Sequence, residues 1–170
     1  SPTALRINEW LAIATTPFNN DFVELYNPGA LPVSLGGLFL SDEIIGRKNR
    51  HEMPALSFMP GFGYQRLVAD GDADAGADHL DFSLNGDQGE IGLFLPDLTS
   101  IDCVYYQAQR LNVAQGRSPN GGGNLAFFDT PTPGAPNPLV VINPQGGALV
   151  INEVLANNAS ALENGRTPDW

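Results

Sequence analysis

The sequence predicts an all-β fold, an antiparallel β-sandwich of about nine short strands. Apolar and polar residues alternate with a period of two in short runs, which is the pattern of half-buried strands. Turn-forming residues, among them 19 glycines and 14 prolines, separate these runs at intervals of about ten residues. No segment repeats its apolar residues at helical spacing. A chain of 170 residues is long enough for one full domain with residues to spare.

The run from Phe22 to Tyr26 is the strand around which the other elements can be arranged. Val23 and Leu25 fall on one face of this strand. Phe22, Glu24 and Tyr26 fall on the other face, and an Asn-Pro-Gly turn ends the run. Because both faces carry bulky side chains, both must be covered, so we expect this strand in the interior of a sheet.

The other strands follow from the same alternation and from the turns between them. In the run 79–84, Leu80 and Phe82 alternate with polar residues and are expected to face the core. Pro54 removes a ladder donor from the run 51–54, which is therefore expected at a sheet edge. The remaining strands are expected at 5–14, 32–35, 38–40, 64–69, 90–95, 101–106 and 125–128.

Loops are expected where polar residues, glycine and proline gather. The stretch 42–50 is basic and is expected to be a solvated surface excursion. Met-Pro-Gly at 59–61 is expected to turn the chain, and the glycine-rich stretch 116–121 is expected to form another loop.

The charge balance and the single cysteine limit the classes of function. Eight basic and nineteen acidic residues give a net charge of −11, which repels nucleic-acid phosphates and anionic lipids, so no nucleic-acid partner is expected. No apolar run is long enough to predict insertion into a membrane. Cys103 is the only cysteine, so neither a disulfide within the chain nor a cysteine zinc site is possible. It alternates with Ile101 and Tyr105 in a predicted strand, where we expect a buried and inert thiol.

A run of carboxylates between two predicted strands is the strongest candidate for a metal site. The spacing is close to that of a calcium loop for Asp70, Asp72, Asp74 and Asp78. The match is incomplete, because glycine falls one place late and the last ligand position holds Asp81 in place of glutamate. Two interpretations stay open, a calcium site or a solvated acidic turn, and calcium is the only cofactor that the sequence suggests.

The sequence holds no motif for catalysis, so we expect no enzyme activity. His51 and His79 lack the spacing of a histidine metal site. Ser83 and Ser118 have no partner base in sequence, and no G-x-S-x-G is present. Aromatic residues suit either a sandwich core or a sugar-binding platform. Two tyrosines adjacent in the run 101–106 must point to opposite faces, so one of them is expected to leave the core.

Several short motifs occur in an order that resembles one protein family. Ile7-Asn8-Glu9 is followed, after a short loop, by Asp-Phe-Val-Glu-Leu-Tyr-Asn-Pro at 21–28. The later motifs G-L-F-L-S-D, M-P-G, F-S-L, G-R-S-P and T-P-T-P-G-A-P-N stand at 37–42, 59–61, 82–84, 116–119 and 130–137. This ordered set resembles the lamin-tail domain family, in the form found as bacterial tandem repeats. The resemblance implies an immunoglobulin-like β-sandwich without catalytic machinery. Phe22 stands where the family more often has tryptophan.

The end of the chain repeats its beginning. Residues 149–156, L-V-I-N-E-V-L-A, repeat residues 5–12, L-R-I-N-E-W-L-A, at an offset of 144 (149 − 5). An offset this long indicates a repeated domain. We therefore expect one lamin-tail-like domain at 1–138, a linker at 139–148 and the start of a second repeat at 149–170. The orphan strand 149–156 is expected to be disordered, or to pair with a neighbouring chain or with an edge of the first domain.

These observations predict a non-catalytic spacer and interaction module, one repeat of a larger extracellular or envelope protein. Its partner would be another protein or a cell-surface polymer. Two alternatives stay open: a calcium-stabilised module that binds a carbohydrate-type ligand, and an accessory domain of a secreted hydrolase. The assignment of function and location depends on the family resemblance and on the acidic composition.

Overall fold

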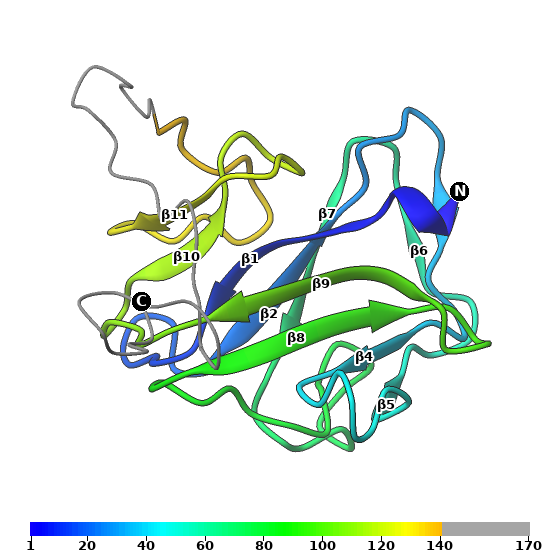
Figure 1. Ribbon diagram of the computed structural model, residues 1–170, viewed down its shortest axis with the longest axis horizontal. Coiled ribbons are helices and arrows are strands. Elements are labelled where there is room, and N and C mark those ends of the chain that lie inside the picture. The colour runs from blue at the N-terminus through cyan, green and yellow to red at the C-terminus, as the bar shows by residue number, and fades with distance from the viewer. Residues whose placement is uncertain (141–170) are drawn as a thin grey trace, which may run out of the picture. The chain divides into compact units, whose positions relative to one another are not determined.

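The computed structural model describes residues 1–140, which contain eleven strands and one short 3₁₀ helix (Figure 1). The expected second repeat at 149–170, its orphan strand 149–156 and most of the expected linker lie outside the described residues. The elements are η1 (Pro2–Ala4), β1 (Arg6–Leu11), β2 (Phe22–Tyr26), β3 (Val33–Ser34), β4 (Phe39–Ser41), β5 (His51–Glu52), β6 (Phe58–Met59), β7 (Tyr64–Val68), β8 (Gly89–Phe94), β9 (Ser100–Tyr106), β10 (Ala114–Arg117) and β11 (Leu125–Phe128).

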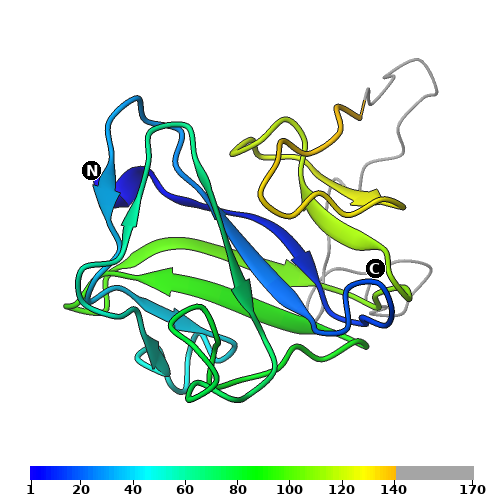
Figure 2. The same ribbon diagram turned by 180° about the vertical axis from the view of Figure 1, so that it is seen from behind.

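Two antiparallel sheets face each other, which confirms the predicted all-β sandwich. The larger sheet has the strand order β11-β10-β1-β2-β7, and the smaller has the order β5-β4-β8-β9. A short pair, β3-β6, stands beside them. Figures 1 and 2 show β8 and β9 layered against β1 and β2. Apolar side chains from both sheets form one continuous core, as expected when each sheet buries one face.

Strand β2 lies between β1 and β7, in the interior of the larger sheet, as predicted. Val23 and Leu25 are fully buried in the core between the sheets. Phe22 lies on the other face of β2, in a second apolar cluster with Leu11 and Phe128. Both faces of β2 are therefore covered, and Glu24 is buried on the same outer face as Phe22.

The run 79–84 is buried as predicted but is not a strand. Leu80 and Phe82 face the core, whereas Ser83 is exposed. Only two isolated bridges occur in the run, a parallel one at His79 with Val68 and an antiparallel one at Ser83. A single ladder cannot be parallel at one end and antiparallel at the other, so the segment is extended without a continuous register.

Two predicted turns belong instead to strands. Residues 114–117 form β10, an interior strand of the larger sheet, although 116–121 was expected to be a loop. A Cβ atom at Gly116 would overlap the carbonyl oxygen of Asn8, so this glycine permits the close approach of β10 to β1. Met59, expected in a turn, pairs with Val33 in the β3-β6 pair.

The edge strands decide which side chains reach solvent. Strand β5 is an edge of the smaller sheet, as Pro54 predicted, and β9 is the other edge. In β9, Tyr106 faces the core and Tyr105 is 63% exposed. Cys103 lies on the same face as Tyr105 and is half-buried, with its Sγ 3.2 Å from Ser100 Oγ. The expectation of a buried thiol was therefore wrong, because the outer face of this edge strand is open to water.

The Asn-Pro-Gly turn after β2 is fixed by the side chain of Asn27. Its Nδ2 donates to the carbonyl oxygens of Leu31 and Pro60, at 2.9 and 3.0 Å. Its Oδ1 accepts from the N–H of Gly29 at 3.0 Å. One buried amide thus joins two loops at the end of β2, where the sequence motif ends. In the described part of the chain, no helix is long and apolar enough to cross a membrane.

Candidate functional site

The acidic run 70–78 does not gather its carboxylates around one point. Asp72, Asp74 and Asp78 are exposed in the loop that follows β7. Asp70 instead places Oδ2 2.8 Å from His79 Nδ1, and its Oδ1 accepts from the N–H of Asp72. Among residues 1–140, no three His, Cys, Asp or Glu side chains lie together in a way that could hold a metal ion.

Asp81, the last position of the calcium spacing, lies in a different cluster. Its Oδ1 is 3.9 Å from both Arg50 Nε and His51 Nδ1. Arg50 Nη1 also contacts Asp42 at 2.5 Å and Glu43 at 3.3 Å. Burial lowers the pKa of His51, and the charge of Asp81 acts in the opposite sense. The guanidinium of Arg50 therefore faces the carboxylates of Asp42, Glu43 and Asp81. Asp81 is thus separated from the other four aspartates of the calcium spacing.

A buried polar cluster lies on the outer face of the larger sheet. Residues 130–138, here called the exit segment, bond to polar side chains of β1 and β2 and of the loop after β10. Figures 1 and 2 show the exit segment, in yellow to orange, beside β10 and β11. We call this group the clasp, and it consists of Asn8, Glu9, Glu24, Asn120, Thr132, Gly134 and Asn137.

Two glutamates form the centre of the clasp. Glu9 and Glu24 are register partners across β1 and β2, and both are 0% exposed. Glu9 accepts from the N–H of Thr132 at 2.9 Å and from its hydroxyl at 3.2 Å. Glu24 accepts from the N–H of Gly134. Each carboxylate therefore holds one backbone donor of the exit segment, and the β-sheet register sets the distance between the two carboxylates.

Burial changes the proton affinity of both glutamates. It raises the pKa of Glu9 to about 7, against the opposing effect of the Thr132 hydrogen bonds. It also raises the pKa of Glu24 to about 7, and the neighbouring charge of Glu9 adds to the increase. The N–H of Gly134 and the amide of Asn8 favour ionised Glu24, but desolvation outweighs them.

Three asparagines complete the clasp around the glutamates. Asn8 Nδ2 donates to Glu24 and to Asn120 Oδ1, at 3.4 and 3.2 Å. Asn120 Oδ1 also accepts from the N–H of Asn137 at 2.9 Å. Asn137 Nδ2 donates to the carbonyl oxygens of Asn8 and Arg117, at 3.0 and 2.9 Å. The exit segment is thus joined directly to the first strand and to the end of β10.

An ion pair between Arg117 of β10 and Asp102 of β9 joins the two sheets. Arg117 Nη2 lies 2.9 Å from both oxygens of Asp102, and its Nε donates to the carbonyl oxygen of Ile7 at 2.8 Å. Asp102 Oδ2 in turn accepts from the N–H of Ile7 at 2.9 Å. Both charged side chains are nearly buried, so the pair links β10 and β1 of the larger sheet to β9 of the smaller.

The clasp was not predicted from the sequence, although its residues belong to the motifs that carried the family resemblance. Ile7-Asn8-Glu9 supplies two members, the motif in β2 supplies Glu24, and the run 130–137 supplies three. Asn120 follows directly on the Gly-Arg-Ser-Pro motif. A charged residue on a strand with bulk on both faces was the available signal, because such a residue needs a buried partner.

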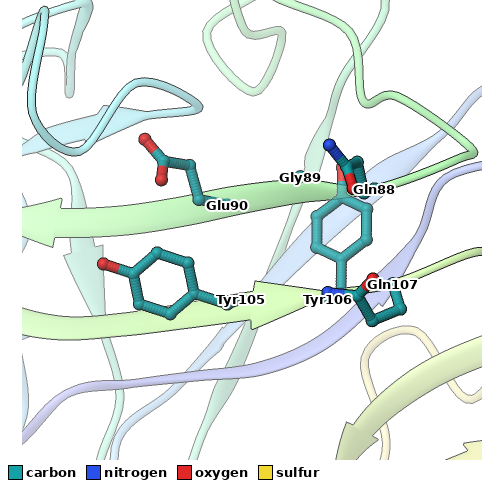
Figure 3. A pocket seen from close by; sticks show the side chains of 6 residues that line it. All are labelled: Gln88, Gly89, Glu90, Tyr105, Tyr106 and Gln107. Carbon is teal, nitrogen blue, oxygen red and sulfur yellow. The ribbon is translucent and has the colours of Figure 1, made fainter. Parts of the chain in front are cut away.

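A shallow depression of about 350 Å³ lies on the outer face of β8 and β9 (Figure 3). Glu90 and the exposed Tyr105 are register partners there, and Gln88 and Gln107 stand at one end. Glu90 Oε1 accepts from the N–H of Ile44 at 2.6 Å, which fixes its carboxylate. The depression therefore offers one exposed aromatic ring and several polar groups.

Comparison of the chain with protein-family models, with curated proteins and with solved structures finds no match. The buried carboxylates of the clasp are occupied by hydrogen bonds from the chain itself. The arrangement holds the exit segment in place on the larger sheet.

Proposed function

We propose that this chain contains a lamin-tail-like, immunoglobulin-like module that serves as a non-catalytic spacer and interaction domain in a larger extracellular or envelope protein. The observation that supports this proposal most is the clasp. Polar residues of three separate motifs meet there with Asn120, which follows a fourth motif, in one buried network whose bonds fix the path of the chain. The polar side chains of these motifs form hydrogen bonds within the module itself. A module stabilised in this way is suited to hold neighbouring domains at a fixed separation.

The clasp also ties the two ends of the module together. Asn137 Nδ2 donates to the carbonyl oxygen of Asn8, so the exit segment is bonded to the first strand. Ser118 Oγ adds bonds to the carbonyl oxygen of Pro138 and to the N–H of Val140. In a tandem array, in which 149–156 would begin the next module, any tension between neighbours would pass through these bonds.

A distance measurement across the module tests the spacer proposal. Nitroxide labels at Thr3→Cys and Leu139→Cys, in a Cys103→Ser background, would report the separation of the two ends by pulsed electron paramagnetic resonance. Both labelled positions are exposed, so the labels should not disturb the core. A spacer requires one narrow distribution of distances. A broad distribution in the folded protein would contradict the proposal.

Binding of a carbohydrate-type ligand is a second candidate function, favoured by the depression on β8 and β9. Tyr105 presents its ring to solvent there, and sugars stack on such rings while amides and carboxylates bond to their hydroxyls. Titration with soluble xylo-, cello- and chito-oligosaccharides, followed by NMR, should shift the amides of β8 and β9. The shifts should be lost in Tyr105→Ala and retained in Tyr105→Phe, and their absence with every oligosaccharide would argue against this function.

A further inference from the structure

Two buried carboxylates share the clasp without a cationic partner. Glu9 and Glu24 lie on the same face of adjacent strands and are both fully buried. Within residues 1–140, no Lys, Arg or His nitrogen lies within 4.0 Å of either carboxylate. Like charges this close and this well desolvated disfavour the state in which both groups are ionised.

Within residues 1–140, no cationic group on the surrounding elements forms an ion pair with either glutamate. Arg66 of β7 is the register partner of Glu24, but its guanidinium lies 5.7 Å from the centre of the Phe22 ring. Arg6 of β1 donates to the carbonyl oxygens of Thr3 and Leu5. Tyr26 and Tyr64 stack on each other at 4.9 Å near Glu24, and β10 presents Gly116 opposite Glu9. The exit segment contains no charged residue.

We propose that the exit segment is a pH-dependent latch, closed while the Glu9–Glu24 pair retains a proton and released when both carboxylates are ionised. One proton removes the repulsion between the two groups, and the protonated carboxyl still accepts from the exit segment through its carbonyl oxygen. With both groups ionised, the missing hydration can be regained only if the segment that covers them lifts away. The raised pKa values of Glu9 and Glu24, about 7 for each, place this transition near neutral pH.

The release would be local, because the other side chains of the clasp that bond across it are neutral amides. Asn8, Asn120 and Asn137 are neutral amides, and the side chain of Arg117 bonds to Asp102 of the smaller sheet. The core between the sheets does not include the two glutamates. The latch uses the same clasp contacts that support the spacer proposal, but its test follows two backbone N–H groups and does not use the distance between the ends of the module.

Amide hydrogen exchange on the intact protein tests the latch. The N–H groups of Thr132 and Gly134 donate directly to the two glutamates, so their protection reports closure. After correction for intrinsic exchange, their protection factors should fall at least roughly tenfold from about pH 5.5 to about pH 8.5. The N–H of Ile91 in β8 should keep its protection factor. Equal protection of Thr132 and Gly134 at both pH values would overturn the proposal.

A matched pair of variants separates the latch from a general effect of pH. Glu9→Gln combined with Glu24→Gln keeps an acceptor at each position and removes the titration, so the protection of Thr132 and Gly134 should no longer depend on pH. Glu52→Gln removes an exposed carboxylate on β5 and should leave the wild-type dependence unchanged. A fall in protection that survives in the double variant would overturn the proposal. If the double variant does not fold, the exchange profile of the wild-type protein decides alone.

Discussion

Glu9 and Glu24 are register partners in the middle of the larger sheet, and each holds a backbone N–H of a segment more than a hundred residues further along the chain. Strands β1 and β2 therefore bury carboxylates on the face where a sandwich sheet normally meets water. The exit segment covers that face and supplies the hydrogen bonds that make the burial tolerable.

The stability of the protein should fall as the pH rises from about 5 to about 8. Both glutamates have a pKa of about 7 in the folded state against an ordinary value of 4.5, so the folded state binds protons more tightly than the unfolded state. The stabilisation that proton binding gives is full below the unfolded pKa and is lost as the pH rises through the folded pKa. The loss is at most about 3 kcal/mol for each carboxylate.

Urea unfolding across this pH range measures the effect. His51 has a lowered pKa and acts in the opposite sense, so His51→Gln should steepen the dependence on pH. Glu9→Gln with Glu24→Gln should flatten it. A free energy of unfolding that rises with pH in the wild-type protein would contradict the assignment of a raised pKa to the glutamates.

Asn137→Ala should destabilise the protein by about 2 to 4 kcal/mol. The substitution removes three hydrogen bonds, one of them accepted from the Thr132 hydroxyl, and leaves the carbonyl oxygens of Asn8 and Arg117 without this donor. Asn124→Ala, on an exposed side chain in the loop before β11, is the matched control and should change stability by less than about 0.5 kcal/mol. Equal effects of the two substitutions in urea unfolding would show that the clasp contributes nothing at Asn137.

Asp102→Ala should destabilise the protein by about 3 to 5 kcal/mol, because it leaves Arg117 nearly buried without its counter-charge. Asp102→Asn should cost less, since an amide oxygen can still accept from the N–H of Ile7. A double-mutant cycle with Arg117→Met measures the coupling. A coupling energy near zero would mean that the two side chains do not interact across the sheets.

Gly116→Ala should destabilise the protein by about 1 to 3 kcal/mol, because the added methyl group meets the backbone of β1. Gly123→Ala is the matched control, since a Cβ atom there has nothing within 4 Å. Thermal unfolding should show a lowered Tm for the first variant and little change for the second. A Gly116→Ala protein with the wild-type Tm would refute the close approach of β10 to β1.

Calcium at millimolar concentration should leave the Tm almost unchanged. The carboxylates of Asp72, Asp74 and Asp78 are exposed in the loop after β7, and Asp70 is bonded to His79. A bound ion would raise the Tm by linkage to folding. A clear rise that disappears in Asp72→Ala with Asp74→Ala would contradict this expectation and would establish the calcium site that the spacing suggested.

The interior position of β2 was predictable from local pattern, because a strand with bulk on both faces needs neighbours on both sides. The burial of Leu80 and Phe82 was predictable from their alternation with polar residues, but the absence of a ladder was not. Alternation reports which side chains are buried and does not report backbone pairing. Strand β10 was missed because Gly116 suggests a turn when its approach to β1 is unknown.

The clasp could not be predicted from spacing. The bond from Thr132 to Glu9 spans 123 residues, and the register shift between Ile7 and Glu9 changes which side chains of β1 share a face. Local periodicity reports neither this long-range hydrogen bond nor the register shift. The order of motifs did contain the relevant residues, but their shared role as ligands of one segment appears only when the sheet brings them together.

Removal of the exit segment tests the central claim most directly. The free energy of unfolding of residues 1–129 should be compared with that of residues 1–140 by urea denaturation at about pH 5.5, where the latch is closed. Loss of the segment uncovers Glu9 and Glu24 and removes every hydrogen bond of the clasp that reaches it, so the shorter chain should be less stable by roughly 3 kcal/mol or more. Equal stability of the two chains would contradict the conclusion that the clasp holds this fold together.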